Sequence, residues 1–501
     1  MKRISLSRNV LFGFLSWLLP LGFTILLTPL IVHGLGAEFY GIYALVMGFV
    51  AYSFTFNVGR AITKYVAAYR ANEEHERIGE VLSTTLLINL IIGALSAIAL
   101  ALSANVLVTR VLNIAPKLQA NAKIAFYLAS VGLLVTMLNQ VFNAVPQAVH
   151  RFDVYSLIAT ATGMATIGGN GLLVWLGFGL TSLVAWNVMA TSLSCAAYFV
   201  AARRLLPEAH LAFRFNRDLI TGILRFSGAV IAYQIFANLL LLFERGYLTR
   251  TLGSAAVTFY VVPMTISIYI HAFITSLTLV LFPLASEADA RQDMTGLHTI
   301  YTRAYKYICM LVLFLVLTAA VGSRQLLSNW MGTDFANHAA GVLSTQAFVF
   351  GMMALLVVPW QIADGLGYPW LSALLSLWWL VSTILLAVFL TPRFGIQGMA
   401  YSRLLPMMIT PLFILIVERI AFGRCLWEFW RRIGLALGAA GALTALVQYL
   451  MFQNLPLGWI WFLLTVGASG IVFLAMLLAI RYIDETEQKW LRGLVARVGA
   501  G

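Results

Sequence analysis

Residues 83–106, STTLLINLIIGALSAIALALSANV, carry no charged side chain. A helix of about twenty apolar residues is long enough to cross the hydrocarbon core of a bilayer, so this stretch predicts a membrane-spanning helix. Similar stretches fill the chain, which is 61% hydrophobic and 10% charged, with a mean hydropathy of +0.90. Because only helices and closed barrels satisfy their backbone inside a bilayer, we predict an all-α polytopic membrane protein.

About fourteen transmembrane helices are expected. The predicted spans are 10–32, 40–59, 83–106, 122–144, 154–176, 180–201, 222–243, 255–284, 304–321, 340–362, 369–391, 396–417, 430–452 and 457–480. The first span is too long for the apolar core of a secretory signal, and no small-residue cleavage site follows it, so we expect it to be retained.

The basic residues predict the orientation. With these spans, 24 Lys and Arg residues fall on the side of the N-terminus and seven on the opposite side. Because cytoplasmic loops carry the excess of Lys and Arg, we expect both termini in the cytoplasm and an even number of crossings. The net charge of +13 therefore reflects membrane topology rather than a nucleic-acid surface.

Two halves of the chain share a pattern. Leu35-Gly36, followed by Tyr43, recurs as Leu252-Gly253 and Tyr260 at an offset of 217, and Gly177 recurs as Gly395 at an offset of 218. A common offset indicates duplication of a six-span unit, although convergent turn chemistry would give the same pattern. We predict an N-terminal six-helix lobe at 1–206, a C-terminal six-helix lobe at 207–425, and two further helices with a cytoplasmic tail at 426–501. Parallel repeats of this kind place a substrate site between the halves, with alternating access.

Charged and polar groups at membrane depth are costly, so they point to the substrate or to a partner. No acidic residue lies deep in the first six spans, whereas basic and amide groups form stripes at helical spacing. The candidates for a substrate-binding cavity are Asn57, Arg60 and Lys64 on span two, Gln234, Asn238, Glu244 and Arg245 on span seven, and Arg403 on span twelve. Such a cavity suits an anionic cargo, because Arg offers forked donors to phosphate oxygens.

Each candidate has a plainer interpretation. Arg60 and Lys64 fit snorkelling topology markers, and Glu244 with Arg245 fits an ion pair at the membrane rim. His271, near the middle of span eight, fits either a packing histidine or a group that couples transport to protons; Glu244 is the other candidate for ion coupling. Arg403 lies about 10 Å below the membrane surface and favours a cavity.

Motifs for other chemistry are missing from the sequence. Cys195, Cys309 and Cys425 lack metal or disulfide spacing, and there is no phosphate-binding Gly loop, nucleotide motif or metal-ligand cluster. We therefore expect no metal and no cofactor beyond a coupling proton or sodium ion. A glycosyltransferase or polymerase would need a catalytic carboxylate and usually a large loop domain, whereas the loops here are short, so we expect no enzyme activity.

Four motifs carry a resemblance to a known family. They are residues 34–43 (GLGAEFYGIY), residues 57–59 (NVG) with 64–67 (KYVA), Glu244-Arg245 followed by Leu252-Gly253 and Tyr260, and residues 392–400 (PRFGIQGMA). In this order and spacing they resemble the polysaccharide transporter family, the O-antigen-type flippases of the multidrug/oligosaccharidyl-lipid/polysaccharide (MOP) superfamily. The chain departs from the family at Asn57, where Asp is common, and at Arg60, where an apolar residue is usual.

The resemblance implies a function. It implies fourteen helices in two lobes in a bacterial inner membrane, and a polyprenyl-pyrophosphate-linked oligosaccharide moved from the cytoplasmic to the outer leaflet. It also implies membrane lipids, a polysaccharide polymerase and glycosyltransferases as partners, and no nucleic acid. The alternative is a cation-coupled multidrug exporter of the same superfamily, which would need a buried carboxylate in the first six spans. The glycan itself has no spacing code in the sequence.

Overall fold

Nearly every predicted span coincides with a helix in the computed structural model, which describes residues 6–52, 62–63, 65–66, 69–70, 72, 74–207, 217–278 and 281–482. The described residues contain no β-strand. Ten helices among them are long and apolar enough to cross a membrane, or eleven if a pair bent by 120° counts as one span. The prediction of an all-α polytopic membrane protein is confirmed, while the count of fourteen stays a prediction.

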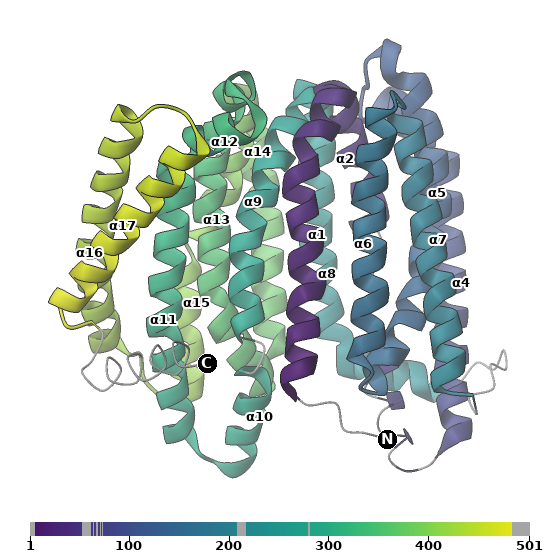
Figure 1. The fold of residues 1–501 in the computed structure, drawn as a ribbon. Coiled ribbons are helices and arrows are strands. Elements are labelled where there is room, and N and C mark those ends of the chain that lie inside the picture. The colour runs from purple at the N-terminus through teal and green to yellow at the C-terminus, as the bar shows by residue number, and fades with distance from the viewer. Residues whose placement is uncertain are drawn as a thin grey trace. The chain divides into compact units, whose positions relative to one another are not determined.

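The chain divides into two compact units. The first comprises residues 1–258 and 372–399, and the second residues 259–371 and 400–501. The helices of the first unit are α1 (Leu6–Leu35), α2 (Ala37–Tyr52), α4 (His75–Val106) with the π-helix η1 (Leu107–Val111), α5 (Pro116–Ala148), α6 (Phe152–Trp175), α7 (Leu180–Leu205) and α8 (Arg217–Leu252). Within this unit α1 packs along α6, and α5 along α4 and α7 (Figure 1).

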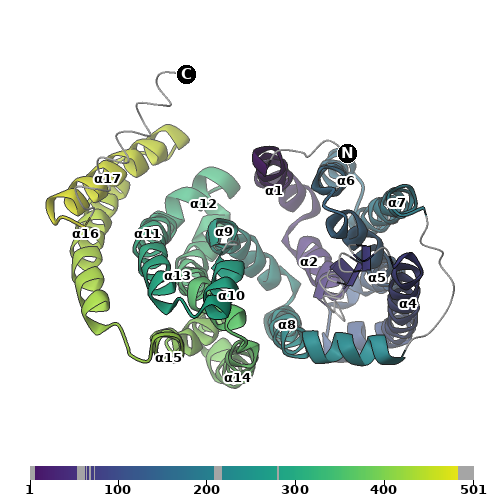
Figure 2. The same ribbon diagram turned by 90° about the horizontal axis from the view of Figure 1, so that it is seen from below.

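The second unit contains the later helices. They are α9 (Ser254–Thr278), α10 (Leu281–Arg291), α11 (Met294–Val321), α12 (Ser323–Met331), α13 (Thr333–Gly365), α14 (Pro369–Met407), α15 (Thr410–Phe422), α16 (Trp427–Asn454) and α17 (Trp459–Ala479); α9 and α14 each cross the boundary between the units. Figure 2 shows α16 and α17 together at the edge of this unit, with α16 packed on α11. The predicted lobe limits at 206 and 425 stay predictions.

Close helix contacts in the first unit depend on small residues, as expected where lipid supplies no hydrophobic drive between helices. A Cβ at Gly41 of α2 would collide with the backbone carbonyl of Ser254 at the start of α9. The hydroxyl of Thr258 donates a hydrogen bond of 2.6 Å to the Ala37 carbonyl at the same contact. Buried side chains of α2, α4, α5 and α7, including Ile42, form the core beside it.

The turns recur at the repeat offset. Gly36 and Gly253 end α1 and α8 with φ of +78° and +87°, and the helices that follow begin at Ala37 and Ser254, again 217 residues apart. His150 and Gly367, also 217 apart, have φ of +58° and +85° after α5 and α13. Their N–H groups donate to the carbonyls of Gln147 and Asp364, which keep the same offset. The backbone therefore repeats in detail what the sequence pattern indicates.

One predicted join lies at Gly395. Residues 391–395 are predicted to join two spans, and Gly395, whose φ of +58° and ψ of −140° are not helical, separates the two helices that together make up α14. The helix ends only at Met407, and α15 begins at Thr410. The expected join is reduced to one glycine, because a single residue in a conformation open to Gly is enough to redirect the chain.

Candidate functional site

The structure describes five of the eight predicted cavity residues. Asn57, Arg60 and Lys64 lie outside the described residues. Gln234, Asn238, Glu244 and Arg245 lie on α8 in the first unit, and Arg403 lies on α14 in the second. The two units are therefore considered separately.

Arg245 is a buried cation held against α2. Its side chain is 5% exposed, and its guanidinium carbon lies 4.9 Å from the ring centroid of Tyr52, the last residue of α2. One terminal nitrogen, Nη1, donates a hydrogen bond of 3.0 Å to the Leu241 carbonyl of its own helix. A Cβ at Gly48 would lie 2.9 Å from the Arg245 Cδ, so the arginine fits only because position 48 has no side chain.

Other polar residues accompany Arg245 along α8. Gln234 and Asn238 are half-buried, and Glu244 is fully buried at 0% exposed. Both Glu244 and Arg245 are buried in the protein, whereas an ion pair at the membrane rim that contributes little would be exposed to solvent. The spacing of 234, 238 and 245 puts the amides on the same face as the guanidinium.

Arg403 has similar surroundings in the second unit. It is also 5% exposed, and its guanidinium carbon lies 5.0 Å from the ring centroid of Phe350 on α13. His271 of α9 is half-buried, and its imidazole interacts electrostatically with the charge of Arg403. The candidate for ion coupling and the candidate anion ligand of this unit therefore lie near one another.

The two arginines share a chemistry. Each is taken out of water, and each is braced by an aromatic face, which stabilises a cation by about 0.5–2 kcal/mol but does not neutralise its charge. A buried guanidinium keeps its affinity for an anion that offers several oxygens, since its planar fork matches carboxylate and phosphate groups. Neither ring was found from the sequence, although Tyr52 and Phe350 are both aromatic residues within predicted spans.

The sequence interpretation missed a polar cluster in the first unit. The Asn170 side chain on α6 donates a hydrogen bond of 3.0 Å to the hydroxyl of Tyr43 on α2, and the Asn187 side chain on α7 donates one of 3.0 Å to Asn170 Oδ1. The Tyr43 hydroxyl lies 3.5 Å from Asn187 Oδ1. This triad ties three helices together. The detectable signal was two Asn residues within apolar spans, since such groups act as interhelical fasteners.

Metal ligands are not grouped in the described part of the chain, where no cluster of three or more His, Cys, Asp or Glu residues could hold a metal ion. Cys195, Cys309 and Cys425 are free thiols. The buried charged side chains among the described residues are Glu244, Arg245, Arg403 and Glu418.

Comparison with known families decides the identity. Residues 6–289, more than half of the chain, match the profile of the family described as polysaccharide biosynthesis proteins. The chain belongs to this family. A relative from Shigella flexneri, named for O-antigen transport, is 21% identical over 403 residues, which cover 80% of this chain and 94% of the relative. The Bacillus subtilis membrane protein EpsK is 23% identical over 338 residues, 65% of each chain.

Solved structures show the fold of this polysaccharide biosynthesis protein. The lipid II flippase MurJ in an inward closed conformation matches with a TM-score of 0.71 at 13% identity, covering 93% of this chain and 97% of MurJ. An inward-facing multidrug resistance transporter of the MATE family and the MOP superfamily matches with a TM-score of 0.64 at 18% identity, covering 88% and 97%. At these identities the likeness establishes the fold alone.

The comparisons confirm the family resemblance read from the sequence motifs. The matching family is described as polysaccharide biosynthesis proteins, and one relative is named for O-antigen transport.

Proposed function

We propose that this polysaccharide biosynthesis protein is a flippase that moves a polyprenyl-pyrophosphate-linked oligosaccharide from the cytoplasmic to the outer leaflet by alternating access. The family and the O-antigen relative support the class of cargo. The observation that carries the proposal is the pair of buried arginines, Arg245 and Arg403, each 5% exposed and braced by a ring.

A pyrophosphate suits these side chains. It presents several negatively charged oxygens, which accept charge-assisted hydrogen bonds from guanidinium groups about twice as strong as neutral ones. In the proposed cycle the headgroup binds to arginine, the glycan lies in a hydrated space and the polyprenyl tail stays in lipid. Arg60 and Lys64 are proposed as further contacts near the entrance, with Asn57, Gln234 and Asn238 as hydrogen-bonding partners.

The test measures delivery of glycan to the outer surface in a strain that depends on a plasmid-borne copy of the gene. We expect Arg403→Ala and Arg245→Ala each to lower delivery by at least about tenfold, the loss of one charge-assisted contact. Arg245→Lys and Arg403→Lys should each retain part of the activity, because lysine keeps the positive charge but lacks the two parallel N–H donors of the guanidinium. The matched control is Arg393→Ala, since Arg393 is exposed; unchanged delivery by both buried-site variants at normal protein levels would refute the proposal.

A double variant tests whether the two arginines serve one headgroup. If both bind the same pyrophosphate, the loss in Arg245→Ala/Arg403→Ala should be smaller than the sum of the two single losses on a free-energy scale, because interacting sites are not additive. Additive losses would mean that the two residues act on separate steps.

The alternative is a cation-coupled multidrug exporter, since MATE transporters share the fold. It would need a buried carboxylate in the first six spans. Three described acidic residues of that region form ion pairs, and none of them is buried. The side chains of Glu38, Glu74 and Asp153 are 46%, 34% and 24% exposed. A deletion strain with wild-type drug sensitivity and lost surface glycan supports the flippase; the reverse result supports the exporter.

The finer assignments form part of the same proposal. We place the protein in a bacterial inner membrane with both termini in the cytoplasm, working beside a polymerase and glycosyltransferases. Energy coupling through a proton or sodium ion would use His271 or Glu244. Transport assays in vesicles with an imposed proton or sodium gradient test this point. We expect a variant of the coupling residue, His271→Gln or Glu244→Gln, to lose the response of transport to one gradient and keep its response to the other.

A further inference from the structure

Glu418, on α15, is a fully buried carboxylate with three donors. Its Oε1 accepts hydrogen bonds from the Tyr301 hydroxyl at 2.9 Å and the Trp430 Nε1 at 2.6 Å, and its Oε2 accepts one from the Leu426 backbone N–H at 2.9 Å. The side chain is 0% exposed. An ionised carboxylate accepts hydrogen bonds and donates none. The three donors around Glu418 therefore match the charged form of its side chain.

The local chain geometry brings these groups together. Gly423, with φ of +70°, ends α15 and reverses the chain, and Leu426 caps the start of α16. The N–H that Glu418 accepts therefore belongs to the first turn of a helix, where backbone amides lack intrahelical partners and the helix dipole favours a negative charge. Glu418 thus accepts a hydrogen bond from a backbone N–H at the start of α16 that has no partner within the helix.

Aromatic rings close the site. Tyr305 lies edge-on to Tyr301 and to Trp430, with ring centroids 4.9 Å apart in each case, and Phe422 packs on Tyr301 at 5.2 Å. Edge-to-face pairs of this kind are stabilising beyond the apolar area that they bury. Tyr301 and Tyr305 are both fully buried on α11, so the carboxylate links α11, α15 and α16 in a dry environment.

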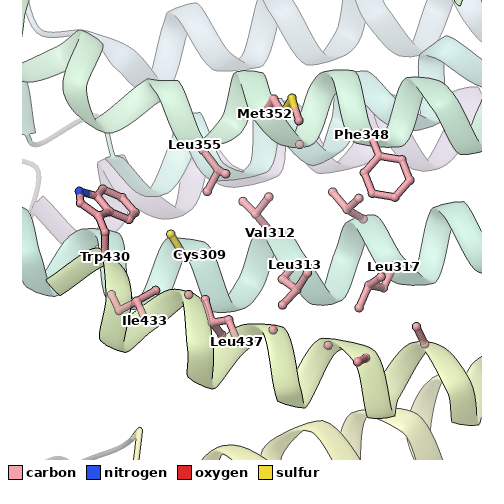
Figure 3. Close-up of a pocket in the computed structure, with 17 residues that line it drawn as sticks. Cys309, Val312, Leu313, Leu317, Phe348, Met352, Leu355, Trp430, Ile433 and Leu437 are labelled. Carbon is pink, nitrogen blue, oxygen red and sulfur yellow. The ribbon is translucent and has the colours of Figure 1, made fainter. Parts of the chain in front are cut away.

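The far end of α16 has its own polar contacts. The Gln448 side chain donates hydrogen bonds of 3.1 Å to the hydroxyls of Thr318 on α11 and Ser469 on α17. Between the two ends α16 borders a cavity of about 510 Å³ that it shares with α11 and α13. Figure 3 shows Val312, Leu313, Phe348, Met352 and Leu437 around this space, with Trp430 at one end. The hydrogen bonds of α16 described here lie toward its two ends, and between them it meets α11 through apolar contacts such as that of Gly441 with Leu313.

We propose that Glu418 is the positioning residue for α16: its carboxylate fixes the first turn of this helix on α11 and α15, and thereby sets the wall of the apolar cavity. The inference stands on contacts within the second unit and does not depend on the identity of the cargo. It assigns a role to a helix that lies outside the duplicated part of the chain.

Hydrogen–deuterium exchange of the full-length protein in lipid nanodiscs tests the proposal. Glu418→Gln keeps the size of the side chain but brings an amide N–H₂ against donors. We expect the backbone amides of residues 424–434 to exchange about tenfold faster, because the variant loses one charge-assisted hydrogen bond. The matched control is Glu428→Gln, the same chemical change on an exposed residue of α16, which should leave exchange at the wild-type rate.

A second variant protects the test against a folding failure. Trp430→Phe keeps a ring against Tyr305 and removes only the indole N–H, so it should raise exchange in the same segment by a smaller factor. Faster exchange confined to residues 424–434, with an unchanged thermal midpoint, supports positioning. Wild-type exchange in both variants, or faster exchange spread evenly over the chain, would overturn it.

Glycan delivery gives an independent reading. If α16 must hold its place during transport, Glu418→Gln should lower delivery while the amount of protein in the membrane stays constant, and Glu428→Gln should not. If exchange is faster but delivery is normal, the positioning role of Glu418 is supported. That result would also show that transport tolerates a less firmly held α16. Failure of the arginine variants in the earlier test leaves this exchange result untouched.

Discussion

Asn187 donates a hydrogen bond of 3.0 Å to the side-chain oxygen of Asn170, and both residues are almost completely buried, at 4% and 3% exposed. The bond joins α7 to α6, and Asn170 passes the connection on to Tyr43 of α2. A buried amide costs stability unless its donors and acceptors are paired, so the three side chains stabilise the first unit only as a set.

Tyr43→Phe should therefore weaken the first unit. The substitution leaves the Asn170 amide without the hydroxyl that accepts its hydrogen bond, at a cost of about 1–3 kcal/mol. Thermal unfolding in detergent measures the effect as a lower midpoint. The control is Tyr127→Phe on α5, where the side chain is 47% exposed; equal midpoints for the two variants would contradict the role of the triad.

Tyr52 should support transport through its ring rather than its hydroxyl. Tyr52→Leu removes the aromatic face beneath Arg245 and should reduce glycan delivery by about two- to thirtyfold, the equivalent of 0.5–2 kcal/mol of cation–π stabilisation. Tyr52→Phe retains the face and should work nearly as well as the wild type. Equal losses in both variants would assign the effect to the hydroxyl.

Gly48 should be intolerant of a side chain for the same reason. Gly48→Val places a branched side chain where the Arg245 Cδ lies, since even a Cβ would come within 2.9 Å of it. We expect delivery to fall as the guanidinium is displaced, with normal protein levels in the membrane. Gly22→Val on α1 is the matched control because nothing lies within 4 Å of its Cβ position, and a comparable loss there would implicate helix propensity instead.

Gly395 should be needed for the bend in α14. Its φ of +58° and ψ of −140° are open to glycine but strained for other residues, at about 1–3 kcal/mol. Gly395→Ala should lower the thermal midpoint measurably. By contrast, Gly467→Ala in α17, where no atom lies within 4 Å of the Cβ position, should leave it unchanged or raise it slightly.

Length and apolar composition are local properties, and for that reason the sequence predicted the helices well. The predicted span 180–201 begins where α7 begins, at Leu180, and the predicted span 369–391 begins with α14 at Pro369. The repeat offset also appears in the turn glycines, because a turn with positive φ restricts which residues fit. The join expected before span twelve lies at Gly395, where a single non-helical glycine separates the two helices of α14.

The partners of buried polar groups could not be predicted in this way. Tyr301 and Glu418 are 117 positions apart, and the spacing of residues along one helix does not determine which other helix it meets. The same applies to Arg403 and Phe350. The sequence correctly marked the arginines as unusual because a charge in an apolar span is costly, but the rings that hold them came from tertiary packing.

The triad of Tyr43, Asn170 and Asn187 has a consequence for the ancestry of the two halves. Tyr260 stands in the place of Tyr43 in the second half, but the positions 218 residues beyond Asn170 and Asn187 hold Val388 and Leu405. The offset thus recurs in the turns, whereas the two amides of this triad do not recur with it. A chimaera made from two first halves would carry this amide triad twice, and one made from two second halves would lack it and would keep instead the hydrogen bond from Tyr301 to Glu418.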